Sequence, residues 1–159
     1  MKLPLPLVAS LTLLAALTLA TPSPVLEKPD LSREALRELS THVVQGQVRA
    51  LYTRTEEDGD WLVTHHLAEV AISRVQKGEG LEAGSLVYAR AWTRTWEGGG
   101  PPPPSTSGHR GLPQQGDLVR LYLARNAYDG FTQDNTDGGF NVIGPNGFEP
   151  TPVKRKSQE

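Results

Sequence analysis

The sequence predicts an all-β fold, a small barrel or sandwich with one short helix in front of it. In the segment from Glu69 to Val87, apolar residues recur at strand spacing on both sides of a polar connection rich in glycine. Further apolar runs with the same alternation flank this segment on both sides. The chain contains no cysteine, so its stability has to come from a buried core rather than from disulfide bonds.

The N-terminal residues 1–20 predict a secretory signal peptide. Lys2 precedes a largely apolar run from Leu3 to Ala20, and the first acidic residue is Glu27. An uncleaved membrane anchor is the alternative, because the run is close to the minimum length of a membrane span. We therefore expect a secreted or periplasmic protein with no membrane span after signal removal. Loss of Lys2 changes the net charge from −2 to −3, which does not favour nucleic acid as a partner.

The elements follow the signal peptide in order. Residues 21–30 contain three prolines and are expected to form an extended leader. Residues 30–40 predict a short helix, capped by Asp30 or Ser32 and expected to plug one end of the barrel. Its apolar face would consist of Leu31, Ala35, Leu36 and Leu39.

The strands are placed by their alternation and by the turn residues between them. The first strand is expected at 43–52, where Gly46 suggests a close backbone approach, and the acidic run 56–60 is expected to be a hairpin turn. A bulge is expected near Ser73 in the second strand. The proline-rich segment 98–108 is expected to be a loop that cannot join a sheet ladder. The remaining strands are predicted at 61–75, 86–96, 118–125 and 140–143, which gives a domain over 31–149 and a flexible tail over 150–159.

The third predicted strand carries the main candidate for a ligand site. One of its faces has only small residues and is expected to point inward: Val87, Ala89, Ala91, Thr93 and Thr95. The opposite face alternates aromatic and basic residues: Tyr88, Arg90, Trp92, Arg94 and Trp96. Such a face could stack sugars and pair with acidic groups, together with the loop residues His109, Arg110 and Tyr128. The alternative is a packed layer in which arginines stack on tryptophans under the proline loop.

Two groups of residues are candidates for metal binding, the histidines and the aspartates of a glycine-rich loop. His65 and His66 are adjacent, so on a strand they point to opposite faces, although either could join His109 and a carboxylate around zinc. Carboxylates in a glycine-rich loop could bind calcium, and the candidates are Asp129, Asp134 and Asp137. The alternatives are ordinary hydrogen-bonded histidines and ordinary turn residues.

Residue types of a hydrolytic triad also occur together, at Ser105, Ser107, His109 and Asp117. They lie in one loop, without the strand-to-helix turn that presents a nucleophilic serine. We therefore expect no enzymatic activity and no cofactor.

The pattern resembles the secreted bacterial domains of the TIMP-like or netrin-like group. The resemblance covers Leu31 to Arg125, and the residues that carry it are the helix before Val43 and the strand and turn positions in 44–48, 69–78, 81–87 and 116–123. It implies an OB-type barrel used for interaction. Inhibitors in this group place an N-terminal cysteine on a protease zinc, and this mechanism does not carry over to a chain without cysteine.

The sequence thus predicts an exported, non-catalytic binding module for a protein partner or a cell-surface polysaccharide. The alternative is a metal-dependent protein, either a calcium-binding loop or a zinc hydrolase.

Overall fold

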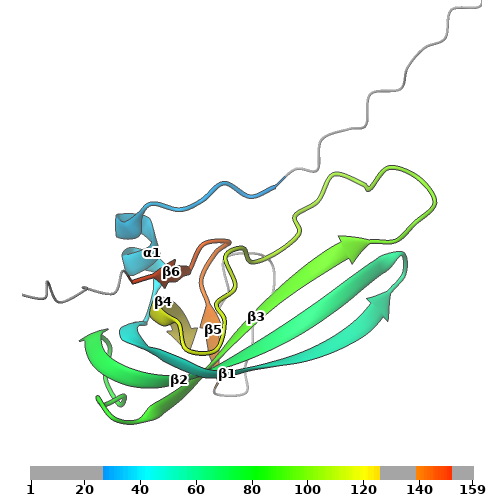
Figure 1. Ribbon diagram of the computed structural model, residues 1–159. Helices are drawn as coiled ribbons and strands as arrows, with labels where there is room; N and C mark the ends of the chain where they lie inside the picture. Colours follow the sequence, from blue (N-terminus) through cyan, green and yellow to red (C-terminus); the bar gives the residue numbers. More distant parts are fainter. Residues whose placement is uncertain (1–26, 126–138, 152–159) are drawn as a thin grey trace, which may run out of the picture.

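The structure is a computed structural model that describes residues 27–125 and 139–151. Strand order is β1-β2-β3-β5-β4, and β1 also pairs with β4, so that these strands close a barrel (Figure 1). All pairs are antiparallel except β3 with β5. The all-β prediction is confirmed, and this closed order is consistent with an OB-type barrel. The elements are α1 (Arg33–Leu39), β1 (His42–Asp58), β2 (Trp61–Lys77), β3 (Leu86–Trp96), β4 (Leu118–Arg125), β5 (Phe140–Val142) and β6 (Phe148–Pro150).

Alternate residues of the strands fill the barrel interior. The small residues Val87, Ala89 and Ala91 of β3 are buried there, as predicted, whereas Thr95 at the far end of the same strand is exposed. The other main contributors are Val44, Val48, Val70, Ile72, Val119, Leu121, Leu123, Val142 and Phe148.

Two predicted irregularities in the hairpin of β1 and β2 are confirmed. Gln45 pairs with Arg74 and Gly46 with Ile72, so Ser73 is the extra residue of a bulge. A Cβ atom added to Gly46 would lie 2.3 Å from the carbonyl oxygen of Ala71, which explains why a glycine occupies this position.

Helix α1 covers the outside of the barrel. Its N-cap is Ser32, whose hydroxyl accepts a hydrogen bond from the backbone N–H of Ala35 at 3.2 Å. Leu36 packs in a second apolar cluster with Val43, Tyr122, Ala124 and Ile143. Since the strand neighbours of these residues point into the barrel, the cluster lies on the opposite, outer face of the strands. The expectation of an end plug is therefore wrong, and Leu39 is 54% exposed instead of buried.

Strands β1, β2 and β3 continue past the barrel as a projecting three-stranded sheet, which we call the arm (Figure 1). The pairing of β1 with β4 ends at Gln47, whereas its pairing with β2 continues to Asp58 opposite Trp61. The connecting turn is only Gly59 and Asp60, with Gly59 at φ 60°. The predicted turn 56–60 is thus too long, because its first residues belong to β1.

The described ranges contain no helix with the length and apolar character needed to cross a membrane. The predicted signal peptide and leader, up to residue 26, and the end of the predicted tail, residues 152–159, lie outside these ranges.

Candidate functional site

The register of β1, β2 and β3 arranges side chains in rows on the outer face, the face turned away from the barrel interior. Residues directly opposite each other in a sheet share a face. From the barrel outward, the rows are Glu69 with Tyr88; Tyr52 with Leu67 and Arg90; Arg54 with His65 and Trp92; Glu56 with Val63 and Arg94; and Asp58 with Trp61 and Trp96. The predicted aromatic and basic face of β3 is therefore one edge of a larger surface.

The proline-rich loop covers the far half of the outer face on β3 and at Trp61, whereas Glu56 and Asp58 of β1 are exposed there. The Arg94 guanidinium lies 4.3 Å from the ring centre of Trp61 and donates a hydrogen bond to the Thr106 carbonyl at 2.8 Å. It also donates to the hydroxyl of Ser105. Trp92 is only 8% exposed, and Trp96 donates from Nε1 to the Gly100 carbonyl at 2.7 Å. In this half the structure shows the packed layer that the sequence analysis gave as the alternative to a ligand site.

The end of this loop joins the sheet. Arg94 donates its backbone N–H to the carbonyl of Ser107 at 2.9 Å, and His109 donates its own to the carbonyl of Trp92 at 2.9 Å. Gly108 forms an isolated bridge with Thr93. The expectation that residues 98–108 cannot join a ladder is wrong for the last of them, because the four prolines occupy only 101–104.

His109 connects three parts of the fold. Its ring is 3% exposed; Nε2 lies 3.0 Å from the Val142 carbonyl oxygen and Nδ1 lies 3.1 Å from the Trp92 backbone nitrogen. A proton on Nε2 lets the ring donate to Val142 and accept from the Trp92 N–H, and Nδ1 also lies 3.0 Å from the Trp92 carbonyl oxygen, so the ring contacts both backbone groups of Trp92. His109 therefore links the loop, β3 and β5, and its ring is largely inaccessible to a ligand.

Arg110 holds the segment before the helix. It donates to the carbonyl of Lys28 at 2.9 Å and pairs with the carboxylates of Asp30 at 2.5 Å and Glu27 at 3.4 Å. Tyr128 lies outside the described residues.

The near half of the outer face is open. Tyr52 is 53% and Tyr88 is 46% exposed, and the Tyr52 hydroxyl donates to the carboxylate of Glu69 at 3.3 Å. The negative charge of Glu69 is the main reason why the pKa values of both tyrosines are raised. Two exposed aromatic rings thus accompany one carboxylate.

A shallow pocket of about 310 Å³ adjoins Tyr52. It is lined by Tyr52, Thr53, Arg54, His65, His66, Leu67 and Arg90. At its rim, Glu56 accepts hydrogen bonds from Arg54 and His65, both at 2.9 Å. The hydrogen bond from His65 is the main cause of the lowered pKa of Glu56. The pocket therefore offers guanidinium, imidazole and apolar surface close to Tyr52.

The histidines are not gathered around one point. His66 is buried on the inner side of the arm, where Nε2 lies 3.0 Å from the Thr93 hydroxyl. Burial is the main cause of its lowered pKa, and repulsion by the protonated forms of His109 and His65 lowers it further. His65 faces the other way, toward Glu56. In the part of the chain that the structure describes, no three histidine, aspartate or glutamate side chains could together hold a metal ion. The calcium candidates Asp129, Asp134 and Asp137 lie outside that part.

The four candidate residues of a hydrolytic triad contact different parts of the fold. Ser105 contacts Arg94, the backbone N–H of Ser107 donates to Glu27 at 3.1 Å, and Asp117 accepts from the backbone N–H of Gln114 at 2.8 Å. His109 is buried between β3 and β5, so the structure does not align these groups as a nucleophile and its base.

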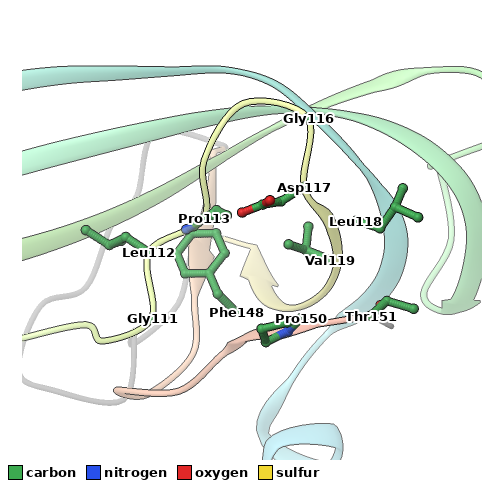
Figure 2. A pocket seen from close by; sticks show the side chains of 10 residues that line it. All are labelled: Gly111, Leu112, Pro113, Gly116, Asp117, Leu118, Val119, Phe148, Pro150 and Thr151. Atoms are coloured by element: carbon green, nitrogen blue, oxygen red, sulfur yellow. The ribbon is translucent and has the colours of Figure 1, made fainter. Parts of the chain in front are cut away.

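A second pocket, of about 410 Å³, lies between the loop 111–117, the start of β4 and β6 (Figure 2). Its lining is mostly apolar, with Leu112, Pro113, Val119 and Phe148, and the carboxylate of Asp117 lies at its side. This pocket was not predicted from the sequence, because one wall is formed by β6, a strand without a periodic signal.

No protein-family model, no curated protein and no solved structure matches the chain. Function is therefore inferred from the geometry of the outer face. Of its open half, the sequence analysis named Tyr88 and Arg90 but missed Tyr52, Leu67 and Glu69. The available signal was the alternation of β1 beyond residue 52, which continues through Arg54 and Glu56.

Proposed function

We propose that the protein is an exported, non-catalytic module that binds a cell-surface polysaccharide. The observation that carries this proposal is the tyrosine patch, which we define as Tyr52, Leu67, Glu69, Tyr88 and Arg90. In this patch, two exposed aromatic rings flank a carboxylate beside a shallow pocket.

The chemistry of the patch suits a sugar chain. An aromatic ring offers a flat apolar surface on which the C–H face of a sugar ring stacks. The Glu69 carboxylate accepts hydrogen bonds from sugar hydroxyls, and the guanidinium of Arg90 donates them. A volume of about 310 Å³ is at the small end of ligand pockets, so it accommodates a short stretch of a longer chain.

Two further considerations support a binding role outside the cell. Residues 1–20 have the composition of a signal peptide, and polysaccharides are abundant where such proteins are delivered. The resemblance to TIMP-like or netrin-like domains also implies an interaction fold, with no transferable catalytic site. A protein partner is the other class that the sequence predicts, and the test below separates the two.

The test is a titration of residues 21–159 with soluble polysaccharides of neutral, amino-sugar and uronic-acid composition, read by affinity electrophoresis. We expect saturable binding, weakened roughly tenfold by Tyr52→Ala or Tyr88→Ala because each removes one stacking ring. The matched controls Tyr52→Phe and Tyr88→Phe keep the ring and should retain most of the affinity.

A surface control is Thr95→Ala, which lies on the arm outside the tyrosine patch and should bind like the parent protein. The proposal is overturned if none of the polysaccharides binds, or if the alanine variants bind as tightly as the parent. Binding that is unaffected by these tyrosines but inhibited by a protein from the same envelope would favour the protein-partner class instead.

A further inference from the structure

The edge of β1 along the arm is unpaired. On one side, β1 pairs with β2 as far as Asp58. On the other side, its ladder with β4 ends at Gln47, and the last bonds join Val48 to Gly116 and Asp117 at 2.8 and 2.9 Å. Within the ranges 27–125 and 139–151, no strand pairs with residues 49–58 on that side. The register with β2 shifts at Arg49, where the free edge begins. The stretch contains neither proline nor glycine, so its outward backbone groups can bind another strand.

The charges along this edge indicate which strand fits. Arg49 lies at its start and Arg54 just past its middle, whereas Glu56, Glu57 and Asp58 occupy its end. In an antiparallel pair of two identical strands, the start of each strand lies opposite the end of the other. The basic start of one copy therefore meets the acidic end of a second copy, and symmetry repeats this contact.

Two registers place opposite charges across the paired edges. With the twofold axis at Thr53, Arg49 lies opposite Glu57 of the partner subunit, and residues 49–57 of both copies pair. With the axis at Thr55, Arg54 lies opposite Glu56 of the partner subunit, but only residues 52–58 pair. We prefer the axis at Thr53 because it pairs the longer stretch, and because an axis at Arg54 would place two arginines opposite each other.

We propose that two copies of the chain pair through residues 49–57 of β1, antiparallel and centred on Thr53, to form a weak dimer with one continuous sheet. The contact is a single pair of edges, which buries far less than the roughly 1,600 Å² of a standard stable interface, so dimerisation requires high protein concentration. This inference does not depend on the proposed polysaccharide binding.

Because the chain has no cysteine, one introduced thiol reports on one position. We expect Thr53→Cys in residues 21–159 to form a covalent dimer rapidly under mild oxidation or with a short bifunctional thiol reagent. Thr95→Cys is the matched control, because it is also exposed on the arm but lies on β3, two strands away from the edge. Cross-linking of Thr53→Cys no faster than of Thr95→Cys would overturn the proposal, and the charges of the edge would then serve to keep copies apart.

Charge exchange tests the register without cross-linking. Arg49→Glu should weaken dimerisation about tenfold in sedimentation velocity, because it replaces two attractive cross-strand pairs by two repulsive ones. Adding Glu57→Arg restores opposite charges and should restore dimerisation. Both positions are exposed, so unchanged melting temperatures would show that the variants fold. A double variant that dimerises no better than Arg49→Glu alone would overturn the register.

Discussion

Replacing His109 by alanine tests the role that the structure gives to this residue. The ring is buried, and it connects the carbonyl of Val142 on β5 with the backbone N–H of Trp92 on β3. Alanine leaves both backbone groups without these partners and opens a cavity. A lost buried hydrogen bond costs about 1 to 3 kcal/mol and the cavity adds to this cost, so we expect the free energy of unfolding to fall by about 2 to 5 kcal/mol. This is a large part of the roughly 5 to 15 kcal/mol that stabilises a typical domain.

The assay is urea unfolding of residues 21–159, followed by tryptophan fluorescence. His65→Ala is the matched control, because His65 is partly exposed and pairs with the exposed Glu56, so its loss should cost less than about 1 kcal/mol. His109→Gln should fall between the two variants if it keeps one of the ring's hydrogen bonds. A loss below about 1 kcal/mol for His109→Ala would refute the bridging role and would reopen a functional interpretation of the ring.

Other parts of the fold give predictions of the same kind. Gly46→Ala should cost about 1 to 3 kcal/mol in urea unfolding because its Cβ would meet the backbone of Ala71, whereas Gly99→Ala, with open space around it, should be nearly neutral. Arg94→Lys keeps the charge but loses the planar stack on Trp61. We therefore expect a protease to cut the proline-rich loop faster, at the same peptide bond as in the parent protein. Burial alone would raise the pKa of Glu149, but the hydrogen bonds that it accepts from Arg120 and Tyr122 outweigh this effect and lower the pKa below 4.5. Its contribution to stability is therefore complete above pH 4.5 and is lost as the pH falls through the lowered pKa, and Glu149→Gln should flatten that part of the stability curve.

The sequence predicted those strands whose two faces differ clearly in polarity. β3 and β4 begin and end at the predicted residues, since small or aliphatic side chains alternate there with aromatic or basic ones. The outer part of β1 was missed because Glu56, Glu57 and Asp58 have little intrinsic strand preference; pairing with β2 holds them in the sheet. β6 has only three residues and ends in a proline, so it is defined by its pairing with β4 and carries no periodic signal.

Alternation along the strands could not predict that one half of the outer face is covered by a loop and the other half is open. Alternation shows which residues share a face, but not what covers that face. The cover depends on contacts made by residues distant in sequence, such as Arg94 with Thr106 and His109 with Val142. The sequence analysis therefore named one continuous face on β3, whereas the structure covers Trp92, Arg94 and Trp96 and leaves Tyr88 exposed.

The tyrosine patch and the free edge of β1 together lead to one more prediction. Antiparallel edges related by a twofold axis perpendicular to the sheet place the same face of both copies on the same side. A dimer centred on Thr53 would therefore present two tyrosine patches side by side, one on each copy, because Tyr52 belongs to the edge strand itself. A polysaccharide repeats its unit, so one chain can reach both patches, and linked sites gain affinity through effective concentration. We expect the disulfide-linked Thr53→Cys dimer to bind such a chain at least about tenfold more tightly than the reduced protein at low concentration. Equal affinity of the two forms would mean that the patches do not act on one ligand, even if each of them binds sugar.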